Sequence, residues 1–167
     1  MMNYASIKKT DIANGPGVRV SLFVSGCTHR CRDCFNSEAW DFHYGQPFDE
    51  AAMDQILEAL KPAYISGFSV LGGEPFEPQN QKAVPDGRKT IWCYTGYELE
   101  KDLFCWIDQG NTAVADMLSL IDVLVDGEFV AEKKNLKLRF RGSENQRLLS
   151  AKESLKQRQA VAARLPD

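Results

Sequence analysis

Short apolar segments recur along the chain at intervals that suit strands separated by helices. Runs rich in β-branched and aromatic residues predict the following strands: 18–24, 66–71, 90–94, 120–125 and, as a possible fifth, 136–140. After Asp49, apolar residues recur with a helical period until Pro62, which predicts a helix capped by the Asp49 carboxylate. Alternating strands and helices are typical of the α/β class with a parallel sheet.

The 167 residues correspond to about one domain, and a closed eight-stranded barrel needs roughly 200 residues or more. We therefore expect a partial β/α barrel or an open sheet. Three loops directly follow predicted strands: the cysteine loop from Cys27, the turn 72–75 and the segment 95–97. Functional loops gather at the carboxyl ends of parallel strands, so these loops should converge on one rim. The connection 77–89 does not predict a helix, because it contains two prolines and an Asp-Gly pair.

The composition is that of an ordinary globular chain, with 44% hydrophobic and 26% charged residues. The longest uncharged run, 62–73, is shorter than the roughly 18 residues of a membrane span, so we expect no membrane segment. Lys8, Lys9 and Asp11 lie where the apolar part of a secretory signal would have to be, and we expect a cytoplasmic protein.

Charge is distributed unevenly along the chain. Residues 1–131 carry 10 basic and 19 acidic side chains, whereas residues 132–167 carry 10 and 4. The basic C-terminal segment can bind an acidic partner or can simply be a solvated surface. Because no nucleic-acid motif accompanies it, we expect no nucleic-acid binding. A capping box at Ser150 opens a charged helix that we expect to reach about Leu165 and to be peripheral.

Five cysteines are too unevenly spaced for a disulfide framework, because Cys27, Cys31 and Cys34 form one C-x3-C-x2-C loop. Three thiolates can bind three irons of a 4Fe-4S cluster and leave one iron open for a substrate. They can also supply three of four zinc ligands, or remain unliganded. A structural zinc would take its fourth ligand from His29, His43, Cys93 or Cys105. We expect the last two cysteines to be core residues instead.

Several segments resemble the radical S-adenosylmethionine activases of glycyl radical enzymes. They are 14–19, 22–36, 72–75 and 78–80. Others resemble, more specifically, the activating proteins of anaerobic (class III) ribonucleoside-triphosphate reductases. They are 92–97, 122–129 and 141–147. The resemblance spans about residues 4–147, and its most specific part is C-x3-C-x2-C combined with Gly-Gly-Glu.

This resemblance implies a partial parallel β/α barrel of the radical S-adenosylmethionine type and a 4Fe-4S cluster held by Cys27, Cys31 and Cys34. It implies that S-adenosylmethionine chelates the fourth iron and is cleaved reductively to methionine and a 5'-deoxyadenosyl radical. That radical would abstract a hydrogen atom from a glycine of the reductase large subunit, with electrons from a low-potential donor such as flavodoxin. No side chain is expected to act as an acid or base.

The resemblance also implies contacts to S-adenosylmethionine. Asp33, Cys34 and Phe35 would lie near the adenosyl moiety, and Phe35 as a plain core residue is the competing interpretation. Gly72 and Gly73 would admit the methionyl part, and Glu74 would bind its ammonium group. The competing interpretation of 72–74 is an ordinary glycine turn with a solvated glutamate. We expect His29, Arg30 and Arg32 to be solvated and outside the site.

The family usually has a helix-length segment where this chain has only 81–90, so one crossover helix is expected to be missing. We expect an activase domain over residues 1–147 and a basic helical extension over 148–167. Within the class, an activase of another glycyl radical enzyme such as pyruvate formate-lyase is an alternative. A zinc-stabilised binding module and a small electron carrier are alternatives from other classes.

Overall fold

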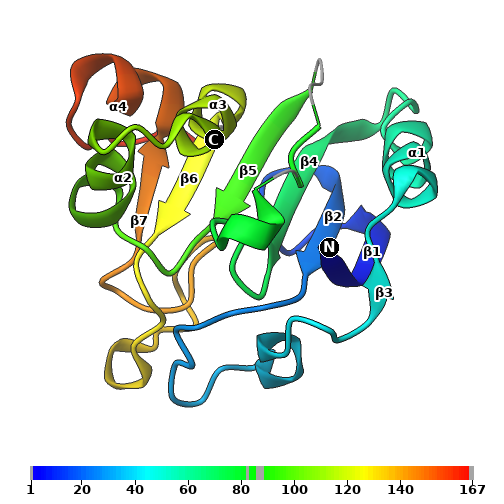
Figure 1. Ribbon diagram of the computed structural model, residues 1–167, viewed down its shortest axis with the longest axis horizontal. Coiled ribbons are helices and arrows are strands. Elements are labelled where there is room, and N and C mark those ends of the chain that lie inside the picture. Colours follow the sequence, from blue (N-terminus) through cyan, green and yellow to red (C-terminus); the bar gives the residue numbers. More distant parts are fainter. Residues whose placement is uncertain (1, 82, 86–88, 166–167) are drawn as a thin grey trace.

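The computed structural model describes residues 2–81, 83–85 and 89–165, and these form one seven-stranded sheet. The sheet has the order β3-β1-β2-β4-β5-β6-β7 (Figure 1). Its strands are β1 (Asn3–Asp11), β2 (Val18–Val24), β3 (Gln46–Pro47), β4 (Ile65–Gly72), β5 (Thr90–Tyr94), β6 (Val123–Asp126) and β7 (Arg147–Ser150). The four middle strands are parallel, and β1 and β7 pair antiparallel to them. The α/β class is confirmed, with a mixed sheet.

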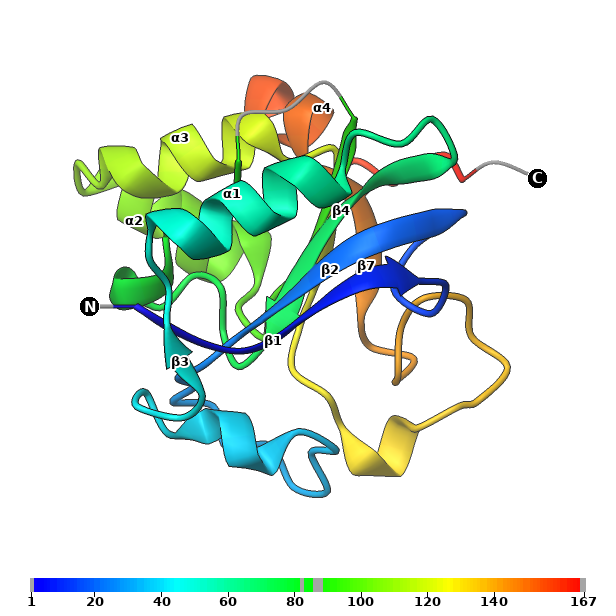
Figure 2. The same ribbon diagram turned by 90° about the vertical axis from the view of Figure 1, so that its right-hand side faces the viewer.

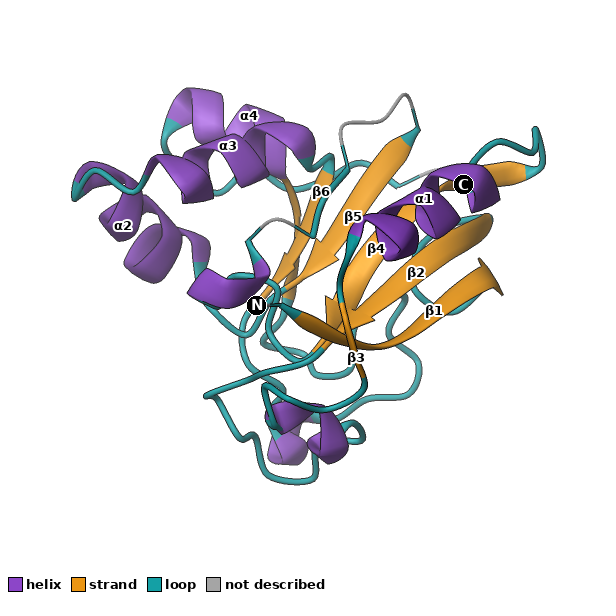
Figure 3. Cartoon of the chain, turned by 45° about the vertical axis from the view of Figure 1, so that its right-hand side comes forward, coloured by secondary structure: helices purple, strands orange, loops and turns teal. Residues whose placement is uncertain are grey.

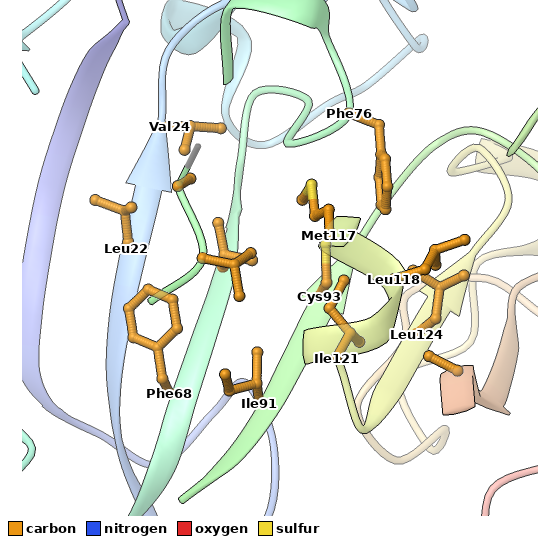
Figure 4. Packing of buried hydrophobic residues seen from close by; sticks show 14 of the residues in the cluster. Leu22, Val24, Phe68, Phe76, Ile91, Cys93, Met117, Leu118, Ile121 and Leu124 are labelled. Atoms are coloured by element: carbon orange, nitrogen blue, oxygen red, sulfur yellow. The ribbon is translucent and has the colours of Figure 1, made fainter. Parts of the chain in front are cut away.

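Four α-helices contribute to one hydrophobic core on one face of the sheet (Figure 2). They are α1 (Glu50–Ala59), α2 (Phe104–Asp108), α3 (Thr112–Leu120) and α4 (Ala151–Gln157). Val20, Leu22 and Val24 point from β2 into this core because side chains alternate along a strand. Figure 4 shows side chains from the parallel strands gathered with those of α3.

The opposite face of the sheet is also covered, and it combines buried polar side chains with buried apolar ones such as Leu71 and Trp92. Arg19 is fully buried there and donates to Ser69 Oγ at 2.8 Å and to the carbonyl oxygens of Phe68 and Thr90 at 2.9 and 3.0 Å. Its guanidinium lies 5.8 Å from the Trp92 ring. Burial lowers the pKa of Arg19 to about 10. Strand β2 is therefore buried on both faces, which explains its nearly continuous apolar run.

The N-termini of α1 and α4 are capped as predicted, but the end of α4 differs from the prediction. The Asp49 carboxylate accepts from the Ala52 N–H at 2.9 Å, as expected for α1. The Ser150 hydroxyl accepts from the Glu153 N–H, but α4 ends at Gln157 because Arg158 adopts a left-handed conformation. The expectation of a helix to about Leu165 is therefore wrong.

Residues beyond 147 complete the sheet. Strand β7 pairs with β6, and the chain returns after α4 so that Ala162 bridges Leu149. Leu149 and Ala151 lie in the hydrophobic core, so the helix is not peripheral. The boundary expected after residue 147 falls within β7.

The predicted fifth strand at 136–140 is wrong. These residues belong to the long loop between β6 and β7, where Leu136 is 89% exposed and Phe140 has a positive φ of 60°. Strands β1, β3 and β7 were not predicted, because they are short or carry many polar residues. The short helices outside the sheet layer are η1 (Ser37–Trp40), η2 (Pro78–Asn80), η3 (Leu99–Leu103) and η4 (Ala131–Lys133).

The connection between β4 and β5 is short, as expected. Within its described residues the helical part is η2, and no α-helix crosses over there. Residues 82 and 86–88 of the segment 81–90 lie outside the described residues. Across the described ranges, no helix combines the length and apolar character needed to cross a membrane.

Candidate functional site

A cavity of about 370 Å³ lies at the carboxyl ends of the parallel strands. Loops after β2, β4, β5 and β6 line it, and Figure 3 shows these loops gathered beyond the strand ends. The predicted convergence is confirmed, because the cysteine loop, the glycine turn and the segment after β5 all contribute to the walls. The lining residues of these three loops include Cys27, Cys31, Cys34, Gly72, Gly73, Thr95 and Gly96.

The three clustered cysteines carry free thiols and face this cavity. Burial raises the pKa of Cys27 to about 11 and also raises the pKa of Cys31. Within the described part of the chain, no three Cys, His, Asp or Glu side chains converge on a single ion. In a four-iron cluster each thiolate binds a different iron, so three thiols that line one cavity can hold such a cluster.

Gly72 and Gly73 bring the turn after β4 against the backbone of the cysteine loop. The Gly73 N–H donates to Val24 O at 2.7 Å, and the Glu74 N–H donates to Gly26 O at 2.8 Å. A Cβ on Gly73 would lie 2.5 Å from Gly26 O, and Gly72 has a positive φ of 108°. Glycine is required here for close contact between two backbone segments.

Glu74 lies below the cavity wall and is 1% exposed. Its carboxylate accepts from four donors: Thr95 Oγ1 at 2.7 Å, the Gly96 N–H at 2.7 Å, the Phe76 N–H at 2.9 Å and His29 Nε2 at 2.9 Å. These contacts join the loops after β2, β4 and β5. The interpretation of Glu74 as a solvated residue is therefore wrong.

Two further residues of the same turn hold the cysteine loop. Glu77 Oε1 accepts from the N–H and hydroxyl of Thr28 at 3.0 and 2.6 Å. Asn80 Nδ2 donates to Ser25 O and to Glu74 O, both at 2.9 Å. The sequence analysis did not identify these contacts, because the partners lie about fifty positions apart.

Phe35 and Asp33 occupy the exposed end of the cysteine loop. Phe35 is 91% exposed and lines the cavity, so its interpretation as a core residue is wrong. Asp33 is exposed, has a positive φ of 60° and lies 4.0 Å from Arg32 in an ion pair. Unlike its neighbours Cys34 and Phe35, Asp33 is not among the residues that line the cavity.

The three residues expected to be solvated differ from one another. Arg32 is exposed and pairs with Glu132, and the exposed Arg30 lies over the Trp40 ring. His29 is mostly buried, with Nε2 2.9 Å from Glu74 and Nδ1 2.9 Å from a carboxylate oxygen of Glu128. The expectation that His29 is solvated is therefore wrong, and His29 lines the cavity. Burial lowers its pKa, but the two carboxylates outweigh burial and raise it to about 9.

The other two cysteines do not behave alike. Cys93 is fully buried in the core, as expected, and burial raises the pKa of its thiol. Cys105 on α2 is exposed, so its expected core position is wrong. Neither provides a fourth ligand beside the cysteine loop.

The loop after β6 also lines the cavity, with residues that were not predicted as part of the site. Phe129, Leu138 and Phe140 line it, together with Arg141 and Gln146 from the loop after β6. Tyr94 lines the cavity from β5, and among the described residues no partner lies within hydrogen-bonding distance of its buried hydroxyl. Burial raises the pKa of Tyr94, so the hydroxyl keeps its proton as a donor.

A family model and several known proteins match most of this chain. Residues 13–149 match a family model described as a 4Fe-4S single cluster domain. The chain is 43% identical over 159 residues to the anaerobic ribonucleoside-triphosphate reductase-activating protein of Escherichia coli K12, covering 87% of this chain and 96% of that protein. Proteins of the same name from Pasteurella multocida Pm70 and Enterobacteria phage T4 are 41% and 37% identical over 158 residues. They cover 87% and 89% of this chain and 95% and 94% of their own length. Because such identity extends over most of each protein, this chain belongs to the family of anaerobic ribonucleoside-triphosphate reductase-activating proteins.

Proposed function

We propose that this chain is an enzyme that activates an anaerobic ribonucleoside-triphosphate reductase by generating a glycyl radical on its large subunit. Cys27, Cys31 and Cys34 hold a 4Fe-4S cluster in this proposal, and S-adenosylmethionine binds beside it. The observation that carries the proposal is that three free thiols and the Gly72-Gly73 turn share one cavity. The iron–sulfur family model supports the cluster assignment.

The cluster and S-adenosylmethionine together would supply one-electron cleavage of a sulfonium carbon–sulfur bond. The protein itself would position the two cofactors and exclude competing reactions. Cys27, Cys31 and Cys34 would hold three irons of the cluster and leave the fourth without a cysteine ligand. Apolar side chains such as Phe129, Leu138 and Phe140 line the same cavity and limit access of water.

In this proposal different residues contact different parts of S-adenosylmethionine. Gly72 and Gly73 offer an accessible backbone to the methionyl part, and Glu74 fixes that turn, since its carboxylate already accepts from four donors. In this proposal the adenosyl part lies near Asp33, Cys34 and Phe35, and the lining of the cavity by Cys34 and Phe35 supports this assignment.

The fold and partners follow from the same proposal. The sheet has four parallel strands, β2, β4, β5 and β6, and the cavity lies at their carboxyl ends. This arrangement suits a partial β/α barrel of the radical S-adenosylmethionine type. Electrons would come from a low-potential donor such as flavodoxin. A cytoplasmic location suits free thiols and a reductase partner.

The deciding experiment is anaerobic reconstitution followed by electron paramagnetic resonance. The protein should bind about four irons and four sulfides per chain. The spectrum of the reduced protein should change when S-adenosylmethionine is added, and a glycyl radical should appear on the reductase when it is present. Cys31→Ala should abolish cleavage of S-adenosylmethionine, whereas Cys105→Ala, at an exposed cysteine outside the cavity, should not.

The alternatives give different results in the same experiment. A zinc module would be colourless and redox-inert, and a simple electron carrier would show a spectrum that S-adenosylmethionine leaves unchanged. An activase of pyruvate formate-lyase would activate that enzyme in preference to the reductase. The relatives compared above are all named for the reductase, which favours the proposed partner.

A further inference from the structure

His29 connects the cysteine loop to the loops after β4, β5 and β6. Its two ring nitrogens each lie 2.9 Å from a carboxylate oxygen, one of Glu74 and one of Glu128. Its ring packs edge-on against Tyr97, with centroids 4.3 Å apart. A Cβ on Gly96 would lie 2.7 Å from the ring, so the glycine leaves room for His29.

Both contacts are of a strong type. Ionised carboxylates only accept hydrogen bonds, so both ring nitrogens of His29 donate. Hydrogen bonds between charged groups are shorter and stronger than neutral ones. The side chain of His29 is only 9% exposed, and Glu74 is 1% exposed, so this pair is shielded from solvent.

His29 lies between two of the proposed cluster ligands, two residues after Cys27 and two before Cys31. The neighbouring Arg30 and Arg32 are exposed and make only surface contacts, with the Trp40 ring and with Glu132, respectively. Thr28 is held by Glu77, so consecutive residues of the loop are fastened to one turn. Without His29, the buried Glu74 would lose one of its four donors and the loop would lose its links to Glu74 and Glu128.

We propose that His29 is a positioning residue that holds the cysteine loop in its cluster-binding conformation by bridging Glu74 and Glu128. The thiols are then arranged before the cluster arrives, and the cluster is retained because the loop between its ligands cannot swing away. This inference rests on the proposed function, because it assumes the cluster on Cys27, Cys31 and Cys34.

The test compares two histidine substitutions. His29→Phe keeps a ring against Tyr97 but removes both donors. His43→Phe is the matched control, because the His43 side chain is 95% exposed. After anaerobic reconstitution, His29→Phe should lose iron to a chelator about 10- to 100-fold faster than the wild type, the usual effect of losing a residue that orients metal ligands. His43→Phe should behave like the wild type.

Two milder variants remove only part of the interaction and remain informative if His29→Phe does not fold. Glu128→Gln leaves the Glu74 contact in place, and His29→Gln keeps one donor, so both should lose iron at intermediate rates. Electron paramagnetic resonance of the reduced cluster should be broadened in His29→Phe and largely restored in His29→Gln, which a general loss of stability would not produce. If circular dichroism shows that His29→Phe does not fold, these two variants decide the test.

The outcomes separate the two proposals. A wild-type protein that binds no cluster contradicts the proposed function itself. A wild-type protein that binds the cluster, with iron loss equally slow in the wild type and in every folded His29 and Glu128 variant, overturns the positioning role alone.

Discussion

Glu74, Glu77 and Asn80 lie three residues apart, and each of them fastens one residue of the cysteine loop. Their partners are His29, Thr28 and Ser25, respectively. The glycines before them permit backbone contact, and the polar side chains then hold the loop in register. The Gly-Gly-Glu turn therefore has a structural role in this chain besides any contact with a ligand.

Gly73→Ala should displace the cysteine loop, because its new Cβ would lie 2.5 Å from Gly26 O. We expect a stability loss of roughly 1–3 kcal/mol in urea unfolding, together with poor iron binding after reconstitution. Gly110→Ala is the control, since its Cβ would meet no atom within 4 Å and only its positive φ of 96° is strained. Normal iron content in a folded Gly73→Ala protein would contradict this explanation.

Tyr94→Phe should weaken binding of S-adenosylmethionine without affecting the cluster. Tyr94 lines the cavity, and its hydroxyl is buried without a protein partner among the described residues, so a ligand that settles against Tyr94 can accept its hydrogen bond. One such hydrogen bond is worth about 0.5–1.5 kcal/mol, or roughly a 2- to 12-fold change in Kd. Equilibrium titration of the reconstituted protein measures it, with Tyr64→Phe on the exposed surface as control. An unchanged Kd would show that the hydroxyl has no ligand.

At the scale of elements, a buried carboxylate stabilises the sheet near each of its two sides. On the side of β1, the Asp11 carboxylate at the end of that strand accepts from Ser21 Oγ at 2.6 Å and from Asn14 Nδ2 at 2.7 Å. On the other side, Arg147 of β7 pairs with the buried Asp126 of β6. These interactions fix the ends of strands that have few apolar residues of their own.

Asp11→Asn should lower stability at neutral pH, and the difference from the wild type should shrink in acid. Burial acts to raise the pKa of Asp11, but hydrogen bonds from Ser21, Ala13 and Asn14 outweigh it, so the folded-state pKa lies below its ordinary value of 3.8. The stabilisation is therefore present above about pH 4 and is lost as pH falls through the folded-state pKa. Urea midpoints between pH 3 and pH 7 measure this, and a constant difference would refute it.

At the scale of the whole molecule, residues 148–165 pack onto the same sheet and core as the rest of the described chain. Leu149 and Ala151 are buried in the core, and β7 covers the edge of β6. The basic charge of this end is therefore carried by a surface that is attached firmly to the sheet.

A chain that ends at residue 147 should fail to fold stably. It would lose β7, expose β6 and remove Leu149 from the core. Circular dichroism and thermal unfolding of the 1–147 chain should show lost or much less cooperative structure. A chain that ends at Arg158 keeps β7 and α4 and should remain folded. A cooperative, equally stable 1–147 protein would show that the last residues form a separate extension.

The sequence was sufficient for features that depend on local patterns. The apolar run of β2, the Asp49 cap and the order of loops after parallel strands were all predicted, because periodicity, capping and chain direction are local properties. The motif C-x3-C-x2-C likewise identified the thiols that face the cavity.

Only the tertiary structure decided which distant residues meet. His29 contacts Glu74 and Glu128, which lie 45 and 99 positions away. Phe129 and Phe140 line the cavity from a loop whose segment 136–140 has the pattern of a strand but does not form one. Phe35 and Cys105 are both exposed although their side chains are apolar, because burial depends on what packs over a residue and not on its type alone. Local sequence determined which thiols line this cavity, and long-range packing determined how their loop is held.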